Sequence, residues 1–256
     1  MNQRELEFAA GAIRDADSVV ALTGAGVSTA SGIPDFRSAD GIWSEYDPRE
    51  FHVSRFRSDP EGFWRDRVDL VEEMFGDDVG PNAAHEALAR LEAGGQLDGL
   101  ITQNVDGLHQ AAGSEDPVEI HGNGRRVACT GCGRRADADP VFERARNGDV
   151  PPACEQCGDV LKPDVVLFGE QLPEHALFEA HSLSESADAY LVVGSSLTVE
   201  PAASLPRTAA ERGATLVVVN LEATDISDRA EYDFRADVAE ALPRLAGHAQ
   251  KGTSLL

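Results

Sequence analysis

Short apolar runs separated by amphipathic stretches limit the possible folds more than any other pattern in this chain. Strands are predicted for six runs: residues 18–24, 99–105, 117–122, 164–169, 189–196 and 214–221. The runs are continuously apolar rather than alternating, which is typical of strands buried on both faces. Amphipathic stretches such as 83–95 and 201–213 lie between several of them and predict helices. Strand, helix, strand in this order predicts an α/β fold with a doubly wound parallel sheet.

Two segments interrupt this pattern. Residues 38–84 are rich in aromatic and charged side chains without apolar strand patterns, and residues 125–161 contain all four cysteines but few apolar residues. We interpret them as a smaller unit that is inserted in two pieces. The larger α/β unit then consists of residues 1–37, 85–124 and 162–256.

The cysteines form two CxxC pairs, Cys129 with Cys132 and Cys154 with Cys157, separated by 21 residues. This spacing is typical of a zinc ribbon, in which each pair supplies two corners of a tetrahedron. Four thiolates close the coordination sphere, so the zinc is expected to be structural. Two disulfides are the alternative, and a reducing cytoplasm disfavours them. A nucleic-acid-binding ribbon is a further alternative, which the charge of the chain disfavours.

The charge balance is strongly acidic. The chain has 45 acidic and 22 basic residues, a net charge of −23, and only Lys162 and Lys251 are lysines. Such a surface repels nucleic acids and anionic membranes, so we expect neither as a ligand. The acidity fits either attraction of basic protein tails or solvation in a salt-rich cell interior. We favour a halophilic prokaryote, since at about 1 M salt the Debye length is about 3 Å.

The N-terminus has the pattern of an amphipathic helix and lacks the apolar core of a signal peptide. No run approaches the length needed to span a membrane. We therefore expect a cytoplasmic protein. The sequence does not define its oligomeric state.

The first predicted strand leads into a glycine-containing loop. Gly24, Ala25 and Gly26 allow close approach of the backbone to a pyrophosphate, and Ser28 and Thr29 follow where a helix is expected to begin. A tight strand-to-helix turn alone would also explain the glycines. Thr29 stands where the dinucleotide fingerprint has its third glycine, which disfavours an ordinary dehydrogenase.

Polar side chains follow the second predicted strand. The stretch TQNVDGLH, residues 102–109, contains Gln103, Asn104, Asp106 and His109. Ligands bind at the carboxyl ends of strands in open α/β sheets, so these residues are candidates for a binding site. Asp106 as a helix N-cap is the alternative, and it leaves the other polar residues unexplained. We expect His109 to be structural.

Seven motifs together resemble the sirtuins, the NAD-dependent protein lysine deacylases, in order and spacing. They are GAGVSTASGIPDFR, TQNVDGLH, EIHG, the CxxC pairs, LKPDVVLFGE, VVGSSLTVEPAASLP and VVNLE, and the resemblance covers about residues 5 to 245. It implies a Rossmann-like NAD-binding domain. It also implies a small domain made of a helical module, residues 38–84, and a zinc-ribbon module, residues 125–161. NAD and acyl-lysine would bind in the cleft between the two domains.

The resemblance also implies roles for individual residues. The NAD contacts would be Gly24, Ala25, Gly26, Thr29, Phe36, Arg37, Gln103, Asn104, Val105, Asp106, Gly194, Ser195, Ser196, Asn220, Glu222 and Val238. Gln103 and Asn104 would face the nicotinamide ribose, and Asp106 with the backbone of Val105 would hold the carboxamide. Val105 replaces the usual isoleucine, a change of one methylene that we expect to be tolerated. Capping of strand ends is the alternative for the residues after 193.

His121, in the motif EIHG, is the expected catalytic base, with Asn104 beside it. A lone histidine at a strand end is more often structural, but an imidazole facing a ribose can accept a hydroxyl proton near neutral pH. In the implied mechanism the acyl oxygen attacks C1′ of the ribose as nicotinamide leaves, giving an alkylimidate. His121 then deprotonates the ribose hydroxyl that attacks this intermediate. Water completes the release of free lysine, and O-acyl-ADP-ribose is the other product.

The acyl-lysine site is expected in the motif LKPDVVLFGE. Val166 and Phe168 would line an apolar tunnel, and Gly169 and Glu170 would pair with the substrate backbone. The alternative is that Val166 and Phe168 are core residues. Sirtuins that remove acidic acyl groups carry a tyrosine and an arginine in the helical module, and residues 62–75 contain arginines but no tyrosine. We therefore expect acetyl-lysine or another neutral acyl-lysine as substrate.

Three further functions stay open. One is mono-ADP-ribosyl transfer to protein from the same NAD site, and another is removal of longer neutral acyl groups. The third is a non-catalytic module that senses NAD. The intact set of His121, Asn104 and Asp106 disfavours an inactive protein.

Overall fold

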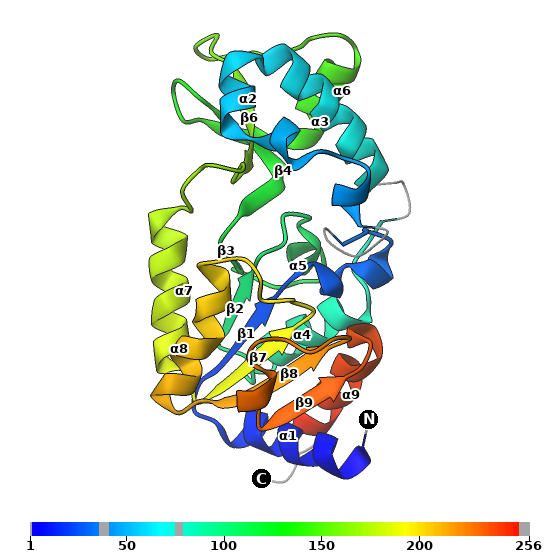
Figure 1. The fold of residues 1–256 in the computed structure, drawn as a ribbon, viewed down its shortest axis with the longest axis vertical. Coiled ribbons are helices and arrows are strands. Elements are labelled where there is room, and N and C mark those ends of the chain that lie inside the picture. The colour runs from blue at the N-terminus through cyan, green and yellow to red at the C-terminus, as the bar shows by residue number, and fades with distance from the viewer. Residues whose placement is uncertain (1, 36–40, 75–78, 251–256) are drawn as a thin grey trace.

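The computed structural model describes residues 2–35, 41–74 and 79–250. Two predicted NAD contacts, Phe36 and Arg37, lie outside the described residues. Figure 1 shows an elongated molecule in which a larger α/β part carries a smaller part at one end. Helices α1 (Gln3–Asp15) and α9 (Val238–Gln250), the first and last of the described helices, lie at the opposite end.

The larger part is built on a sheet with the order β3-β2-β1-β7-β8-β9. Its strands are β1 (Val19–Thr23), β2 (Gly99–Thr102), β3 (Val118–Glu119), β7 (Ala189–Val193), β8 (Thr215–Asn220) and β9 (Tyr232–Arg235). All neighbouring strands pair in parallel. This is the 3-2-1-4-5-6 order of doubly wound sheets, which have their switch point between the first and fourth strands. The predicted fold class is confirmed.

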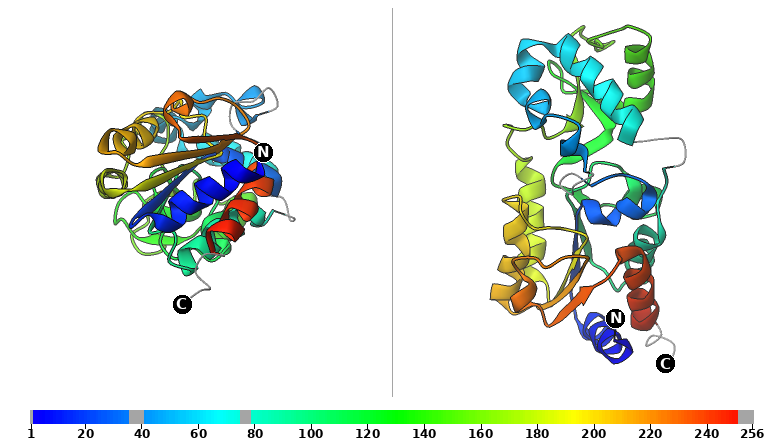
Figure 2. Two further views of the ribbon diagram at one scale, coloured as in Figure 1. Left: turned by 90° about the horizontal axis from the view of Figure 1, so that it is seen from below. Right: turned by 45° about the vertical axis from the view of Figure 1, so that its right-hand side comes forward.

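Helices cover both faces of this sheet (Figure 2). One face carries α1 (Gln3–Asp15), α4 (Ala83–Ala93) and α9 (Val238–Gln250), whose apolar side chains share a core with alternate residues of β1, β7 and β8. The other face carries α7 (Glu174–Ser186) and α8 (Leu205–Arg212). Every residue of β1 and β7 is buried, which explains why their sequences are continuously apolar. None of the described helices combines the length and the apolar character needed to cross a membrane.

The smaller part contains a three-stranded antiparallel sheet of order β5-β4-β6. Its strands are β4 (Gly122–Cys129), β5 (Arg135–Asp137) and β6 (Leu161–Val165), and its helices are α2 (Val53–Ser58), α3 (Pro60–Met74) and α6 (Ala138–Arg146). Phe63, Trp64 and Phe142 are buried where helices and sheet meet, and Trp64 Nε1 donates to Leu161 O at 2.8 Å. Residues 122–124 and 162–165 therefore lie within strands β4 and β6 of the smaller sheet.

The remaining described helices are short. The α-helix α5 spans Leu108–Ala111, and 3-10 helices span Ala25–Val27, Thr29–Ser31, Ile42–Ser44, Pro48–Phe51, Ala202–Ser204 and Ser227–Arg229.

One strand prediction was wrong, and one strand was not predicted. The run 164–169 is not a member of the parallel sheet, because the strand there, Leu161–Val165, pairs antiparallel with β4. The sixth parallel strand is instead β9, which has no apolar run because only Phe234 of its four residues is buried. As the outermost strand of the sheet, β9 needs fewer apolar side chains than the central strands do.

Candidate functional site

The loop after β1 packs directly on the end of β7. Gly24 N donates to Val193 O at 3.1 Å, and Gly26 N donates to Gly194 O at 2.8 Å. A Cβ atom would lie 2.8 Å from Gly194 O if added at Gly24, and 2.9 Å from Gly194 Cα if added at Gly26. Gly194 itself has φ +58, and a Cβ there would lie 2.5 Å from Val27 N. The contact between loop and strand thus requires these glycines.

This packing corrects part of the sequence interpretation. We expected Gly24 and Gly26 to be glycine so that a pyrophosphate could approach, and we expected a helix to begin at Ser28 and Thr29. The chain instead forms two 3-10 turns, and Gly32 ends the second of them in the left-handed conformation, with φ +86. A role in binding phosphate stays a prediction, but packing on β7 is already a sufficient reason for the glycines.

The polar side chains after β2 form a buried hydrogen-bond network with this loop. Asn104 Nδ2 donates to Gly24 O at 3.1 Å and to Ser28 Oγ at 3.2 Å. Ser28 Oγ donates to Asp106 Oδ2 at 2.7 Å. The other oxygen, Asp106 Oδ1, accepts from Leu108 N at 2.8 Å at the start of α5, although the N-cap of this helix is Gly107 rather than Asp106. Asp106 therefore joins the two loops at the switch point.

Two buried histidines, His85 and His109, pack next to this network. His109 is 1% exposed, and its Nε2 lies 2.9 Å from Thr23 Oγ1. Burial and the neighbouring His85 lower the pKa of His109 to about 3, so its ring is neutral. Burial also lowers the pKa of His85, although the Asp106 carboxylate opposes this change. The structure thus places His109 in the interior, as expected for a structural residue.

His85 is a member of the network that the sequence interpretation missed. Its Nε2 lies 3.5 Å from Ser28 Oγ, and its ring contacts the His109 ring with centroids 4.9 Å apart. His85 Nδ1 accepts from Asn82 N at 3.3 Å in a capping box at the start of α4. An asparagine three residues before a histidine at a helix start was the available signal.

His121 lies between β3 of the larger sheet and β4 of the smaller one, and it is half-buried. Its Nδ1 is 2.9 Å from Gln103 O. Because a carbonyl oxygen can only accept, the neutral ring carries its proton on Nδ1, and Nε2 is the basic nitrogen. The side chain of Gln103 reaches the other half of the sheet, where Nε2 donates to Ser195 Oγ at 2.8 Å. The histidine is therefore oriented by the backbone that directly follows β2.

The segment predicted to bind acyl-lysine forms a fixed loop next to β6. Phe168 is 42% exposed and its ring lies 5.5 Å from that of Trp43, so the alternative that it is a core residue is wrong. Val166 is half-buried, and its N–H donates to His121 O at 2.9 Å. Glu170 N donates to Leu167 O at 3.0 Å within the loop, so this N–H is already used and is unsuited to pair with a substrate strand.

Lys162 holds this loop from the side of β6. Its Nζ donates to Val165 O at 2.7 Å and to Glu170 Oε2 at 3.0 Å. The same carboxylate oxygen accepts from Leu167 N at 2.8 Å. Lysine at this position thus closes the loop at both ends.

The predicted NAD contacts near the ends of β7, β8 and β9 have different environments. Ser195 is buried, whereas Ser196 is exposed and its Oγ lies 3.1 Å from Thr198 Oγ1. Asn220 Nδ2 donates to the backbone oxygen of the exposed Glu222 at 3.0 Å, which is strand-end capping. Val238 was expected to contact NAD, but its side chain is 4% exposed and belongs to the core of α1, α4 and α9. Only its backbone is suited to such a contact.

The four cysteines come together at the far end of β4. Their Sγ atoms all lie within 4.8 Å of one another, with 3.3 Å between Cys129 and Cys157 and 3.8 Å between Cys132 and Cys154. Four thiolates around zinc at about 2.3 Å would be about 3.8 Å apart, so the cluster fits a tetrahedral zinc ion. The backbone N–H groups of Cys132 and Gly131 lower the pKa of Cys129 to about 6. Although the backbone hydrogen bond of Asp159 opposes the change, the pKa of Cys157 is raised, because its hydrogen bond with Cys129 and its burial outweigh that bond. None of the four forms a disulfide.

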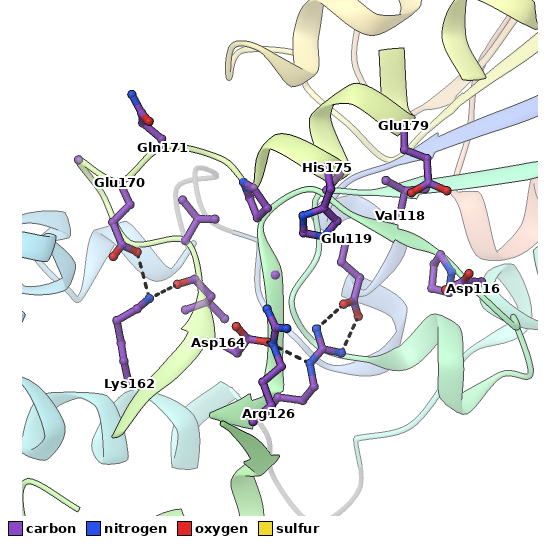
Figure 3. A pocket seen from close by; sticks show the side chains of 18 of the residues that line it. Asp116, Val118, Glu119, Arg126, Lys162, Asp164, Glu170, Gln171, His175 and Glu179 are labelled. Atoms are coloured by element: carbon purple, nitrogen blue, oxygen red, sulfur yellow. Dashed lines mark hydrogen bonds and ion pairs between the residues drawn. The ribbon is translucent and has the colours of Figure 1, made fainter. Parts of the chain in front are cut away.

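A cavity of about 670 Å³ lies between the two sheets. Its walls come from β3 and α7 on one side and from β4, β6 and the loop of Gly169 and Glu170 on the other, as Figure 3 shows. Neither His121 nor Asn104 lines it. The cavity therefore adjoins the predicted acyl-lysine loop without containing the predicted catalytic residues.

A doubly wound sheet with polar side chains at its switch point defines the class of nucleotide-binding α/β proteins. The sequence matches the Sir2 family over residues 24–201. The chain therefore belongs to the Sir2 family, as the motifs predicted.

Individual relatives agree with this assignment. The chain is 56% identical to the NAD-dependent protein deacetylase of Haloarcula marismortui over 242 residues, which are 94% of this chain and 93% of the relative. It is 46% identical to NAD-dependent protein deacetylase 1 of Pyrobaculum aerophilum, covering 94% and 93% of the two chains. A solved Sir2–p53 peptide–NAD+ complex superposes with a TM-score of 0.85 at 38% identity, covering 99% of this chain and all of that one, 100%. The Haloarcula relative fits the expected halophilic prokaryote.

Proposed function

We propose that this chain is an NAD-dependent protein lysine deacetylase that transfers the acetyl group to ADP-ribose and releases nicotinamide. The observation that carries the proposal is the orientation of His121 by Gln103 O, which makes Nε2 the basic nitrogen at the carboxyl edge of the sheet. The relatives from Haloarcula and Pyrobaculum, both named as NAD-dependent protein deacetylases, support the same activity. The Sir2 complex with a p53 peptide and NAD+ supports acyl-lysine and NAD as the two substrates.

In this proposal the residues that follow β2 bind the substrate, and His121 acts as the base. Asn104 and Gln103 bind the nicotinamide ribose, and Asp106 with the backbone of Val105 binds the carboxamide. Asn104 is held in place by Gly24 O and Ser28 Oγ, so its amide is oriented before the substrate arrives. After nicotinamide has left, His121 Nε2 accepts a proton from a ribose hydroxyl. The hydrogen bond from Nδ1 to Gln103 O stabilises the imidazolium that this step forms.

We also propose that zinc holds the smaller unit together and takes no part in the reaction. The cysteines close the coordination sphere, and they lie at the opposite end of β4 from His121. The boundaries predicted for the two units, and a location in the cytoplasm, remain predictions.

The acyl group is proposed to be acetyl or another neutral acyl group, because residues 62–75 contain no tyrosine. One observation favours a second candidate, an acidic acyl group. Arg67 is buried, its Nε has no hydrogen-bond partner in the described part of the chain, and burial lowers its pKa to about 10. A peptide series with acetyl-, butyryl- and succinyl-lysine separates the candidates. A higher kcat/KM for succinyl-lysine than for acetyl-lysine would overturn the neutral preference.

The proposed function is tested by incubating an acetyl-lysine peptide with NAD and the protein at high salt. Mass spectrometry then measures nicotinamide, O-acetyl-ADP-ribose and deacetylated peptide together. We expect all three in equal amounts, and none of the latter two with His121→Ala. His175→Ala, which changes an exposed histidine on α7, is the matched control and should keep wild-type activity.

Other results would identify the alternatives. Transfer of label from the ADP-ribose part of NAD to protein would support mono-ADP-ribosyl transfer. Binding of NAD without release of nicotinamide from a folded sample would support a non-catalytic NAD-sensing module.

A further inference from the structure

A short segment carries His121 from one sheet to the other. Glu119 is the last residue of β3 in the larger sheet, and Gly122 is the first residue of β4 in the smaller one. Gly122 has φ +78, and a Cβ there would overlap Asp164 O, so the chain turns sharply directly after the histidine. The ring position therefore depends on what holds the two ends of this turn.

The Glu119 carboxylate binds side chains of the larger part and of the smaller part, on the two sides of this turn. Oε1 accepts from Asn123 Nδ2 at 2.5 Å and from Gln110 Nε2 at 2.6 Å, and Oε2 accepts from Arg126 Nη2 at 2.5 Å (Figure 3 shows the Arg126 pair). Gln110 belongs to α5 of the larger part, whereas Arg126 belongs to β4 of the smaller part. The carboxylate thus lies before His121 in the chain and binds two side chains that follow it.

The environment strengthens these contacts. The Glu119 side chain is 15% exposed, so salt screens its pair with Arg126 less than it screens a surface pair. Hydrogen bonds to an ionised acceptor are stronger than those between neutral groups. Arg126 is fixed in turn, because its Nε donates to Asp164 Oδ2 at 3.2 Å. Asn123 is buried, and its Oδ1 accepts from Arg125 N at 2.8 Å.

We propose that Glu119 is a positioning residue for His121, acting by holding the turn that presents the imidazole to the substrate. The inference rests on the proposed function, in which His121 acts as the base after nicotinamide has left. Glu119 is the first residue of the motif EIHG and lines the cavity, but neither observation alone gives it a role. Gln103 O fixes the ring at Nδ1, and Glu119 fixes the backbone on either side of it.

The order of the chemical steps provides a specific test. Because nicotinamide leaves before His121 acts, the exchange of labelled nicotinamide into NAD in the presence of acetyl-lysine peptide reports the first step alone. Glu119→Gln keeps the size of the side chain and removes its charge. We expect its kcat for deacetylation to fall about 10- to 100-fold while the exchange rate is unchanged, since small misplacement of a catalytic group has effects of this size.

Two further variants complete the experiment. Glu179→Gln changes an exposed carboxylate on α7 that lines the same cavity, and it should leave both rates unchanged. Asn123→Ala removes one contact of Glu119 and should lower deacetylation selectively as well, which provides a second test if Glu119→Gln does not fold. Loss of exchange and deacetylation in parallel, or retention of both, would overturn the proposal. Absence of both reactions in the wild-type protein would instead overturn the proposed function on which it rests.

Discussion

Replacement of Gly24 by alanine tests why the loop after β1 contains glycine. The new Cβ would lie 2.8 Å from Gly194 O and 2.9 Å from both Cα and Cβ of Ser195. Carbon atoms in good contact are about 3.5–4.0 Å apart, so the loop and β7 would have to separate by roughly half an ångström or more. Overpacking of this kind costs about 1–3 kcal/mol. For a chain of this size that lowers Tm by about 2–4 °C for each kcal/mol.

The matched control is Gly247→Ala in α9. A Cβ at Gly247 meets no atom within 4 Å, and alanine is the better helix former by about 1 kcal/mol. The same chemical change should therefore stabilise the protein at Gly247 and destabilise it at Gly24.

The assay is urea unfolding at one fixed high salt concentration, followed by tryptophan fluorescence, together with NAD titration of the folded protein. We expect Gly24→Ala to unfold at a lower urea concentration and also to bind NAD more weakly, because Asn104 donates to Gly24 O and would move with the loop. If Gly24→Ala unfolded at the wild-type midpoint and lost only NAD binding, the glycine would serve the ligand rather than the packing on β7. That result would refute the reasoning.

Three further predictions concern the metal, the buried histidines and the substrate loop. Cys132→Ser should lose the bound zinc and unfold at a lower urea concentration, and one zinc per chain at an unchanged midpoint would contradict this. The pKa of His109 is lowered to about 3, so only the unfolded chain binds its proton between about pH 6.5 and 3, and the free energy of unfolding should fall by about 1.4 kcal/mol per pH unit as the pH drops through that range. Urea unfolding of His109→Gln should show a smaller decrease from pH 7 to 5, and equal decreases in both proteins would argue against it. Lys162→Ala should raise KM for the peptide but not for NAD, with recovery in Lys162→Arg, and an unchanged peptide KM in steady-state kinetics would count against the role of this lysine.

The sequence predicted a strand correctly where the apolar pattern of that strand alone determines its structure. The buried stretches 189–193 and 216–219 are apolar throughout, so their type and their place in a parallel sheet could be predicted. The run at 164–169 misled because its burial alternates, with Val165 and Leu167 buried and Phe168 exposed, as in a strand or loop with one buried face. When the residues on both faces of a strand are apolar, the sequence does not show whether one face or both faces are buried.

The site was predictable as a set of polar strand ends but not as a network. In the sequence, His85 follows Ser28 by 57 positions and Asp106 follows it by 78. Only the packing of α4 and β2 against the loop after β1 brings these residues together. The same holds for Glu119, whose partner Gln110 belongs to a different element. Motifs identify residues that meet a ligand, whereas these contacts depend on how the elements pack.

The smaller part is built from two separate stretches of the chain, and this limits how it can be exchanged between genes. Its core combines apolar side chains from 41–74 with others from 122–165, and neither stretch contains a complete interior. A recombination event that transferred only one stretch would leave Phe63 or Phe142 without its packing partners. The stretch 122–165 also starts directly after His121. The zinc-bearing sheet and the histidine are therefore expected to pass together from gene to gene, rather than as separately exchangeable modules.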